Sequence, residues 1–131
     1  MADENLRPQV LLADDEPLIR ELIEDALEEA GFDVIVAVSG ASALQLLDEH
    51  ADQLIALVTD ISLGDPPSGW EVATRAREIS PSIAIVYMTG DSAHEWSARG
   101  VPQSSVVTKP FAPSQVVVAL ASLLNKSDVT P

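Results

Sequence analysis

The sequence has no cysteine, and this absence excludes two classes of protein. Without thiols the chain cannot be a disulfide-stabilised scaffold, and it cannot bind a metal through thiolate ligands. Long hydrophobic runs are absent too, because no apolar stretch approaches the roughly 20 residues that a membrane-spanning helix needs. The first nine residues are polar and lack the apolar centre of a signal peptide. We therefore expect a soluble, cytoplasmic protein without membrane association.

Basic residues are scarce: 7 Lys and Arg stand against 21 Asp and Glu, which gives a net charge of −14. This balance argues against nucleic-acid binding, because cations that neutralise phosphates supply most of the non-specific affinity for such partners. It argues against anionic membrane surfaces for the same reason. Many acidic residues fall between Glu16 and Glu29. A solvated helix face explains them better than a partner-specific patch does, although a basic protein partner stays open.

The chain is long enough and apolar enough for one domain with its own core. It has 131 residues, of which 47% are hydrophobic, and a chain of this length buries about two-thirds of its unfolded surface. Strand and helix patterns alternate along the sequence. The predicted strands span residues 10–13, 33–38, 54–59, 83–88 and 105–108, and the predicted helices span 17–30, 39–50 (with Ser39 as the N-cap), 70–79, 91–99 and 113–124.

This alternation predicts a single α/β domain of the (βα)5 type, with five parallel strands in a doubly wound sheet and helices on both faces. We place the domain at residues 9–126. A disordered N-terminal tail (1–8) is expected before it and a C-terminal tail (127–131) after it, because these ends carry no strand or helix pattern.

Polar residues stand where four of the predicted strands end. Asp14 and Asp15 follow the first strand, Asp60 the third, Thr89 the fourth and Lys109 the fifth. In open α/β sheets, ligands bind outside the carboxyl ends of the parallel strands. Each residue has an ordinary structural explanation when taken alone; Asp15, for example, could cap the first helix. One shared site is a more economical explanation than four independent ones.

The charged residues in this set need opposite charges or hydrogen-bond partners nearby. Asp14 and Asp15 are adjacent carboxylates that repel each other unless they share a cation, and hard oxygen ligands suit Mg²⁺. Asp60 ends an apolar strand, where desolvation raises the pKa of a carboxyl unless a cation or a donor compensates. Lys109, between apolar residues, must emerge at the sheet edge or find a carboxylate. The sequence thus predicts an acidic pocket with one ammonium.

Four motifs in this order carry a family resemblance: Val10–Glu16 (VLLADDE), Thr59–Asp60, Met88–Gly90 (MTG) and Lys109–Phe111 (KPF). The chain resembles the receiver domain of response regulators, the phosphoacceptor module of two-component signalling, from about Gln9 to Leu124. The resemblance implies a flavodoxin-like strand order of 2-1-3-4-5. It also implies a phosphorylated signalling module with slow self-dephosphorylation, not a turnover enzyme.

The resemblance implies a role for each residue of the pocket. Asp60 would be the phosphoacceptor, supplied by a histidine kinase or a histidine phosphotransfer protein. Lys109 and Thr89 would contact phosphoryl oxygens, and the Lys109–Pro110 peptide would be cis. Mg²⁺ would be held by Asp14 (through water), Asp15, Asp60 and the backbone carbonyl of Ser62. The implied output is a conformational change at the face formed by the fourth helix, the fifth strand and the fifth helix, read by a downstream protein or through a homodimer.

The sequence departs from the family pattern at two places. Val106 occupies the position, three before the lysine, where the family often has an aromatic switch residue; Tyr87 or Trp96 could replace it, although packing explains both. The loop 61–69 is one residue longer than the common pattern and lacks the usual proline four residues after the phosphoacceptor.

Three functions are therefore compared. The first is a stand-alone receiver without an output domain. The second is a Mg²⁺-dependent aspartyl-phosphate hydrolase, which is disfavoured because Ser62 stands where such enzymes place a second acid. The third is a degenerate receiver that acts as a constitutive interaction module, which Val106 leaves open. His50 and His94 are isolated and are interpreted as surface residues.

Overall fold

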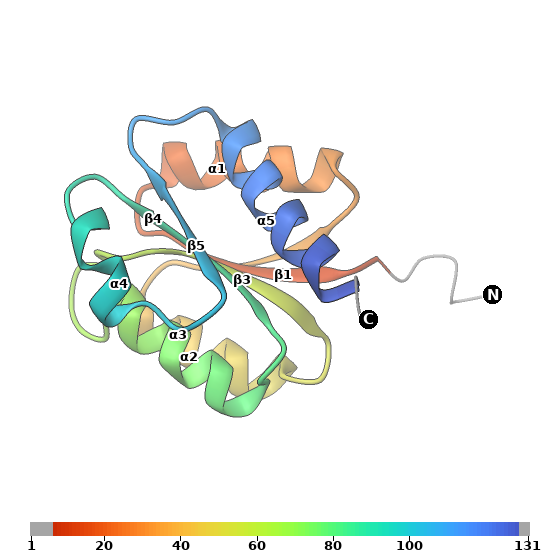
Figure 1. Ribbon diagram of the computed structural model, residues 1–131, viewed down its shortest axis with the longest axis horizontal. Helices are drawn as coiled ribbons and strands as arrows, with labels where there is room; N and C mark the ends of the chain where they lie inside the picture. The colour runs from red at the N-terminus through yellow and green to blue at the C-terminus, as the bar shows by residue number, and fades with distance from the viewer. Residues whose placement is uncertain (1–6, 129–131) are drawn as a thin grey trace.

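The computed structural model describes residues 7–128, which form a five-stranded parallel sheet between two layers of helices (Figure 1). The strands pair in the order β2-β1-β3-β4-β5, which confirms the predicted doubly wound fold. Their bounds are β1 (Gln9–Ala13), β2 (Asp33–Ala37), β3 (Leu54–Asp60), β4 (Ala84–Thr89) and β5 (Ser104–Thr108).

Helices cover both faces of the sheet because each strand is apolar on both sides. Along β1, Val10 and Leu12 pack into one hydrophobic cluster, whereas Leu11 and Ala13 pack into the other, as the two-residue period of a strand requires. Figure 1 shows α1 (Pro17–Glu29) and α5 (Pro113–Asp128) on one face. The other face carries α2 (Gly40–His50) and α3 (Gly69–Ile79).

Local sequence signals explain where the helices begin and end. Pro17 opens α1, and Gly31 follows it with φ +106°, a conformation that glycine adopts without strain. Ser39 caps α2 as predicted, since its hydroxyl accepts a hydrogen bond from the Ser42 amide at 3.1 Å. The helices in the described part of the chain are each too short or too polar to span a lipid bilayer.

Most predicted bounds agree with the structure to within one residue, but two predicted helices differ by more. The predicted helix 91–99 is split into a 3₁₀ turn, η2 (Ala93–Glu95), and the short helix α4 (Trp96–Arg99), because this stretch has no continuous apolar stripe to bury and none of its residues is buried. Helix α5 continues to Asp128, into the predicted C-terminal tail, since no proline or glycine interrupts it there.

Arg7, in the predicted N-terminal tail, donates to the carbonyls of Glu28 and Gly31. Residues 1–6 and 129–131 of the predicted tails lie outside the described residues.

The register of the sheet aligns the ends of its strands. Ala13 pairs with Thr59, and Asp60 pairs with Met88. Thr89 pairs with Thr108, directly before Lys109. The residues that follow β1, β3, β4 and β5 are thereby brought to one edge of the sheet.

Candidate functional site

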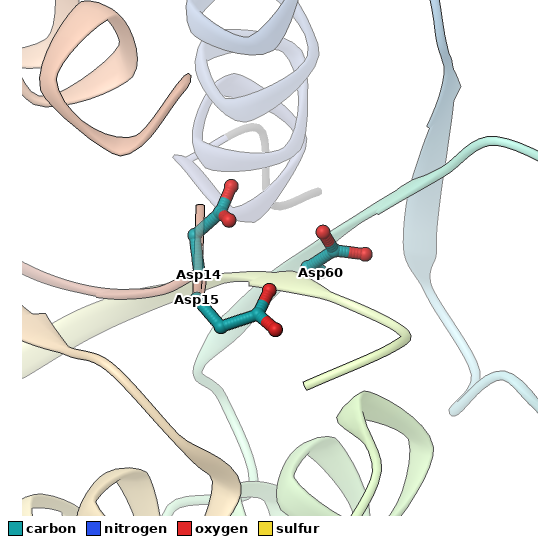
Figure 2. Close-up of side chains that lie close together, drawn as sticks. All are labelled: Asp14, Asp15 and Asp60. Carbon is teal, nitrogen blue, oxygen red and sulfur yellow. The ribbon is translucent and has the colours of Figure 1, made fainter. Parts of the chain in front are cut away.

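Three carboxylates gather at the ends of β1 and β3 (Figure 2). Asp14, Asp15 and Asp60 each offer one oxygen, and these oxygens lie within 4.8 Å of one another. Asp14 and Asp60 are buried, with exposed fractions of 0% and 4%, whereas Asp15 is exposed. The predicted acidic pocket is therefore formed, with one open side.

Asp14 is the most enclosed of the three acids. Its Oδ1 accepts a hydrogen bond from the Glu16 amide at 2.8 Å, but its buried Oδ2 has no hydrogen-bond partner among the described residues. Burial raises the pKa of Asp14 to about 6, although the Glu16 amide opposes this shift and the Asp60 charge adds to it. A buried carboxylate oxygen without a donor is suited to a cation, and clustered hard oxygens fit Mg²⁺.

Asp60 lies between two donors. Lys109 Nζ donates to its Oδ2 at 2.8 Å, and the Ser62 amide donates to its Oδ1 at 3.2 Å. Burial raises the pKa of Asp60, and the hydrogen bond from Lys109 partly offsets this effect. Burial acts most strongly on Lys109 and lowers its pKa, but the hydrogen bonds and negative charges of Asp60, Glu16 and Asp14 together outweigh burial, so the pKa is raised. Lys109 therefore stays charged beside the carboxylate at neutral pH.

The turn after β5 fixes the position of Lys109. Its backbone amide donates to the Thr89 carbonyl at 2.7 Å, and the Lys109–Pro110 peptide is cis, as the resemblance implied. Its ammonium also contacts Glu16 Oε1 at 3.4 Å. Sequence reasoning missed the Glu16 contact. The available signal was Glu16 itself, a third acid directly after the acidic pair.

The structure places the remaining predicted residues at the same edge but leaves their roles as predictions. Thr89 is buried, and its hydroxyl accepts a hydrogen bond from the Ser92 amide at 2.9 Å. Ser62 turns its amide towards Asp60. Asp15 does not cap α1, because Glu16 occupies the N-cap position and makes no side-chain capping bond. The Asp15 carboxylate is thus available to the pocket.

The raised pKa of Asp14 predicts that stability depends on pH. Its pKa is about 6 in the folded protein against an ordinary value of 3.8, so the folded state binds this proton more tightly than the unfolded chain. The resulting stabilisation is complete below the ordinary pKa and is lost as the pH rises to about 6. Urea unfolding in EDTA should show a loss of about 3 kcal/mol from this carboxyl. Asp14→Asn should remove this contribution to the decrease in the free energy of unfolding with rising pH. A variant whose unfolding free energy depends on pH as in the unaltered chain would contradict the prediction.

Comparisons with known proteins agree on one family. The family model described as the response regulator receiver domain matches residues 10–121. The response regulator receiver protein CpdR of Brucella abortus is 34% identical over 118 residues, which cover 88% of this chain and 96% of that protein. The probable transcriptional regulatory protein TcrX of Mycobacterium tuberculosis is 32% identical over 92% of this chain, which spans 51% of that regulator's length.

A solved structure has the same fold at higher identity. The crystal structure of a response regulator receiver protein from Sinorhizobium medicae is 44% identical and superposes with a TM-score of 0.87, covering 91% of this chain and 95% of the other. The likeness therefore extends over almost the whole domain.

Proposed function

This chain belongs to the response regulator receiver domain family, and we propose that Asp60 is its phosphoacceptor, which takes a phosphoryl group from the phosphohistidine of a histidine kinase or a histidine phosphotransfer protein. The contact of 2.8 Å between Lys109 Nζ and Asp60 Oδ2 carries this proposal. It places the ammonium beside a buried carboxylate that lies within 4.8 Å of two other acids. Phosphoryl transfer depends mainly on such positioning and charge neutralisation.

The reaction is an in-line displacement at phosphorus. A carboxylate oxygen of Asp60 forms the new P–O bond while the P–N bond to the donor imidazole breaks, and the imidazole keeps the bonding electron pair. With acetyl phosphate, the bond between phosphorus and the acyl oxygen breaks and acetate leaves. Lys109 would move from the Asp60 carboxylate to a phosphoryl oxygen, and Thr89 would donate its hydroxyl to another.

Mg²⁺ would be held by Asp14 (through water), Asp15, Asp60 and the backbone carbonyl of Ser62. When bound, it would neutralise charge on the transferred group. The unpartnered Oδ2 of Asp14 supports this assignment. Incubation with Mg²⁺ and acetyl phosphate tests the function: the intact mass should rise by one phosphoryl group, and a chain that gains none would contradict the proposal.

Two alternatives have less support. A phosphatase of the aspartyl-phosphate type needs an acid two residues after the nucleophile, and Ser62 stands there with its amide already bonded to Asp60. A degenerate receiver does not explain why a partly buried ion pair and a buried carboxylate oxygen without a donor lie together at one sheet edge, because both features are costly to the fold unless a ligand uses them.

The proposed output is a change in the surface of α4, β5 and α5, read by a downstream protein or a second copy of the chain.

An apolar groove beside Lys109 supports a protein donor. Leu18 and Leu22 on α1 are 79% and 57% exposed. Two exposed leucines this close together form an apolar patch on the surface. Leu22 lines a cavity of about 440 Å³ whose walls are mainly apolar, with Lys109 at one side, and Leu18 precedes Leu22 by one turn on the same side of α1. The occupant we propose is a helix of the donor that presents its histidine to Asp60, because the groove is continuous with the phosphoacceptor site. The acidic surface of α1 favours a donor helix with basic flanks.

Polar substitution of the groove should separate protein donors from small ones. We expect the double variant Leu18→Ser, Leu22→Ser to slow phosphotransfer from the cognate kinase, found by profiling candidate kinases, by about tenfold or more. Its phosphorylation by acetyl phosphate should be unchanged, because the pocket is intact. Val118→Ser is the matched control, since Val118 is 63% exposed on α5. Equal kinase rates in the double variant and in the control would rule out this groove.

A further inference from the structure

The segment between β4 and β5, residues 92–101, is attached at both ends to side-chain hydroxyls of β4. The Ser92 amide donates to Thr89 Oγ1 at 2.9 Å, and the Val101 amide donates to the Tyr87 hydroxyl at 3.1 Å. Tyr87 and Thr89 are two residues apart on one strand, so both side chains lie on the same face of the sheet. We call residues 92–101 the crossover segment. Its first attachment is a residue of the proposed phosphoryl pocket.

Few other contacts hold the crossover segment in place. It contains only η2 and α4, and none of its ten residues is buried. The Trp96 indole donates to Ser104 Oγ at 2.9 Å, and that hydroxyl donates to the Val101 carbonyl at 2.6 Å. The Arg99 guanidinium lies 5.5 Å from the centre of the Trp70 ring. Trp96 and Val101 also pack, partly buried, against the hydrophobic core on this face of the sheet. Segments with little buried surface open at low free-energy cost, so these two side chains and the polar attachments together decide the position of the segment.

The two attachments differ in their freedom to move. The Tyr87 side chain is fully buried, and its ring packs against Trp70 with 4.7 Å between ring centres. Its register partner on β5 is Val106, a small aliphatic residue that leaves the tyrosine ring in place. Thr89, in contrast, borders the pocket, and its hydroxyl can turn towards a new acceptor there. One end of the crossover segment is therefore fixed and the other is adjustable.

We propose that Tyr87 is a positioning residue that anchors the Val101 end of the crossover segment, so that the segment pivots there when Thr89 responds to a phosphoryl group on Asp60. This inference rests on the proposed function. A turn of the Thr89 hydroxyl towards the phosphoryl group would shift or break its bond to the Ser92 amide. Because Val101 stays on Tyr87, the change falls on the residues between them. The contact of Arg99 with Trp70 and that of Trp96 with Ser104 would then be rearranged.

Gly100 makes the resting arrangement compact. A Cβ added at this position would lie 2.4 Å from Cδ1 of the Trp96 indole, so the ring folds over residue 100 only because that residue has no side chain. The indole reaches Ser104 from this position. Both tryptophans of the chain, Trp70 and Trp96, thus contact parts that would move, which makes tryptophan emission a direct probe.

The test compares the full chain with its Tyr87→Phe variant, which lacks only the anchoring hydroxyl. Each is treated with Mg²⁺ and acetyl phosphate, and three quantities are followed: intact mass, tryptophan emission and amide hydrogen exchange in residues 92–101. In the unaltered chain, phosphorylation should change the emission and accelerate exchange of the segment about fivefold. In Tyr87→Phe, exchange should be about fivefold faster before phosphorylation, because one hydrogen bond is lost. The further change on phosphorylation should be less than about twofold in this variant, with an unaltered mass gain.

Thr74→Val is the matched control, because the Thr74 hydroxyl donates to the Trp70 carbonyl at 3.0 Å but holds no part of the crossover segment. It should respond like the unaltered chain. The inference is overturned if Tyr87→Phe gives the full phosphorylation-dependent change, or if the unaltered chain gains mass without any change in residues 92–101. Absence of the mass gain itself would overturn the proposed function and this inference together. If Tyr87→Phe does not fold, the unaltered chain provides the test: on phosphorylation the Val101 amide, bonded to Tyr87, should keep its slow exchange while the Ser92 amide exchanges faster, and equal acceleration of both amides would overturn the inference.

Discussion

Asp60→Asn is expected to abolish phosphoryl incorporation from acetyl phosphate, with a loss of at least about a thousandfold in rate. An amide has almost the same shape as a carboxylate, but it is a poor nucleophile towards phosphorus. The variant should also bind Mg²⁺ more weakly, because one of three clustered carboxylates is neutralised. Intact mass after incubation with Mg²⁺ and acetyl phosphate measures the first effect, and a Mg²⁺ titration measures the second.

The fold should tolerate this change. The amide introduced by Asp60→Asn keeps an oxygen that can accept from Lys109, and the substitution removes a carboxylate whose pKa burial raises. Asp52→Asn is the control, because it makes the same chemical change at an exposed turn. The control should gain one phosphoryl group like the unaltered chain. A full mass gain in Asp60→Asn would show that another residue accepts the group, and it would end the proposed assignment.

The sequence was sufficient to predict the fold and the composition of the pocket, for physical reasons. Apolar runs of strand length separated by helical periodicity admit few arrangements, and the parallel βα rule selects one class among them. Asp14, Asp60 and Lys109 follow directly from this class, because parallel strands end at a common edge. The 2.8 Å contact between Lys109 and Asp60 confirms that convergence.

Contacts that depend on side-chain direction were not predictable in the same way. Glu16 and Lys109 are 93 positions apart, and their contact depends on how the turn after β5 approaches the start of α1. The sequence predicts one helix at residues 91–99, but the structure there depends on tertiary attachments, such as the bond of Trp96 to Ser104, more than on local periodicity. From the sequence, Tyr87 is either a packing residue or a replacement for the missing aromatic switch. Its pairing with Val106 and its hydrogen bond to Val101 became visible only in the structure.

Gly69→Ala should have the second large effect, because Gly69 lies against the backbone of the proposed phosphoacceptor. A Cβ at this position would be 2.1 Å from the Asp60 carbonyl oxygen and 2.8 Å from Ile61 Cα. Two backbone segments cannot separate as easily as a flexible side chain can move. The amide of Gly69 also donates to the Ile61 carbonyl at 2.8 Å, and this bond fixes the start of α3 on the end of β3. We expect a loss of about 3 kcal/mol or more in the free energy of unfolding, measured by urea titration.

Phosphorylation should report the same displacement independently of stability. A shift of the reacting carboxylate by about 1 Å can cost on the order of a hundredfold in rate, so folded Gly69→Ala should gain its phosphoryl group much more slowly. Gly90→Ala is the control, because an added Cβ there has no atom within 4 Å; its stability should change by less than about 1 kcal/mol. Equal stability of the two variants would mean that α3 can move away from β3 at little cost. A stability loss with a normal phosphorylation rate would mean that the Asp60 carboxylate is positioned by Lys109 and the Ser62 amide, independently of the start of α3.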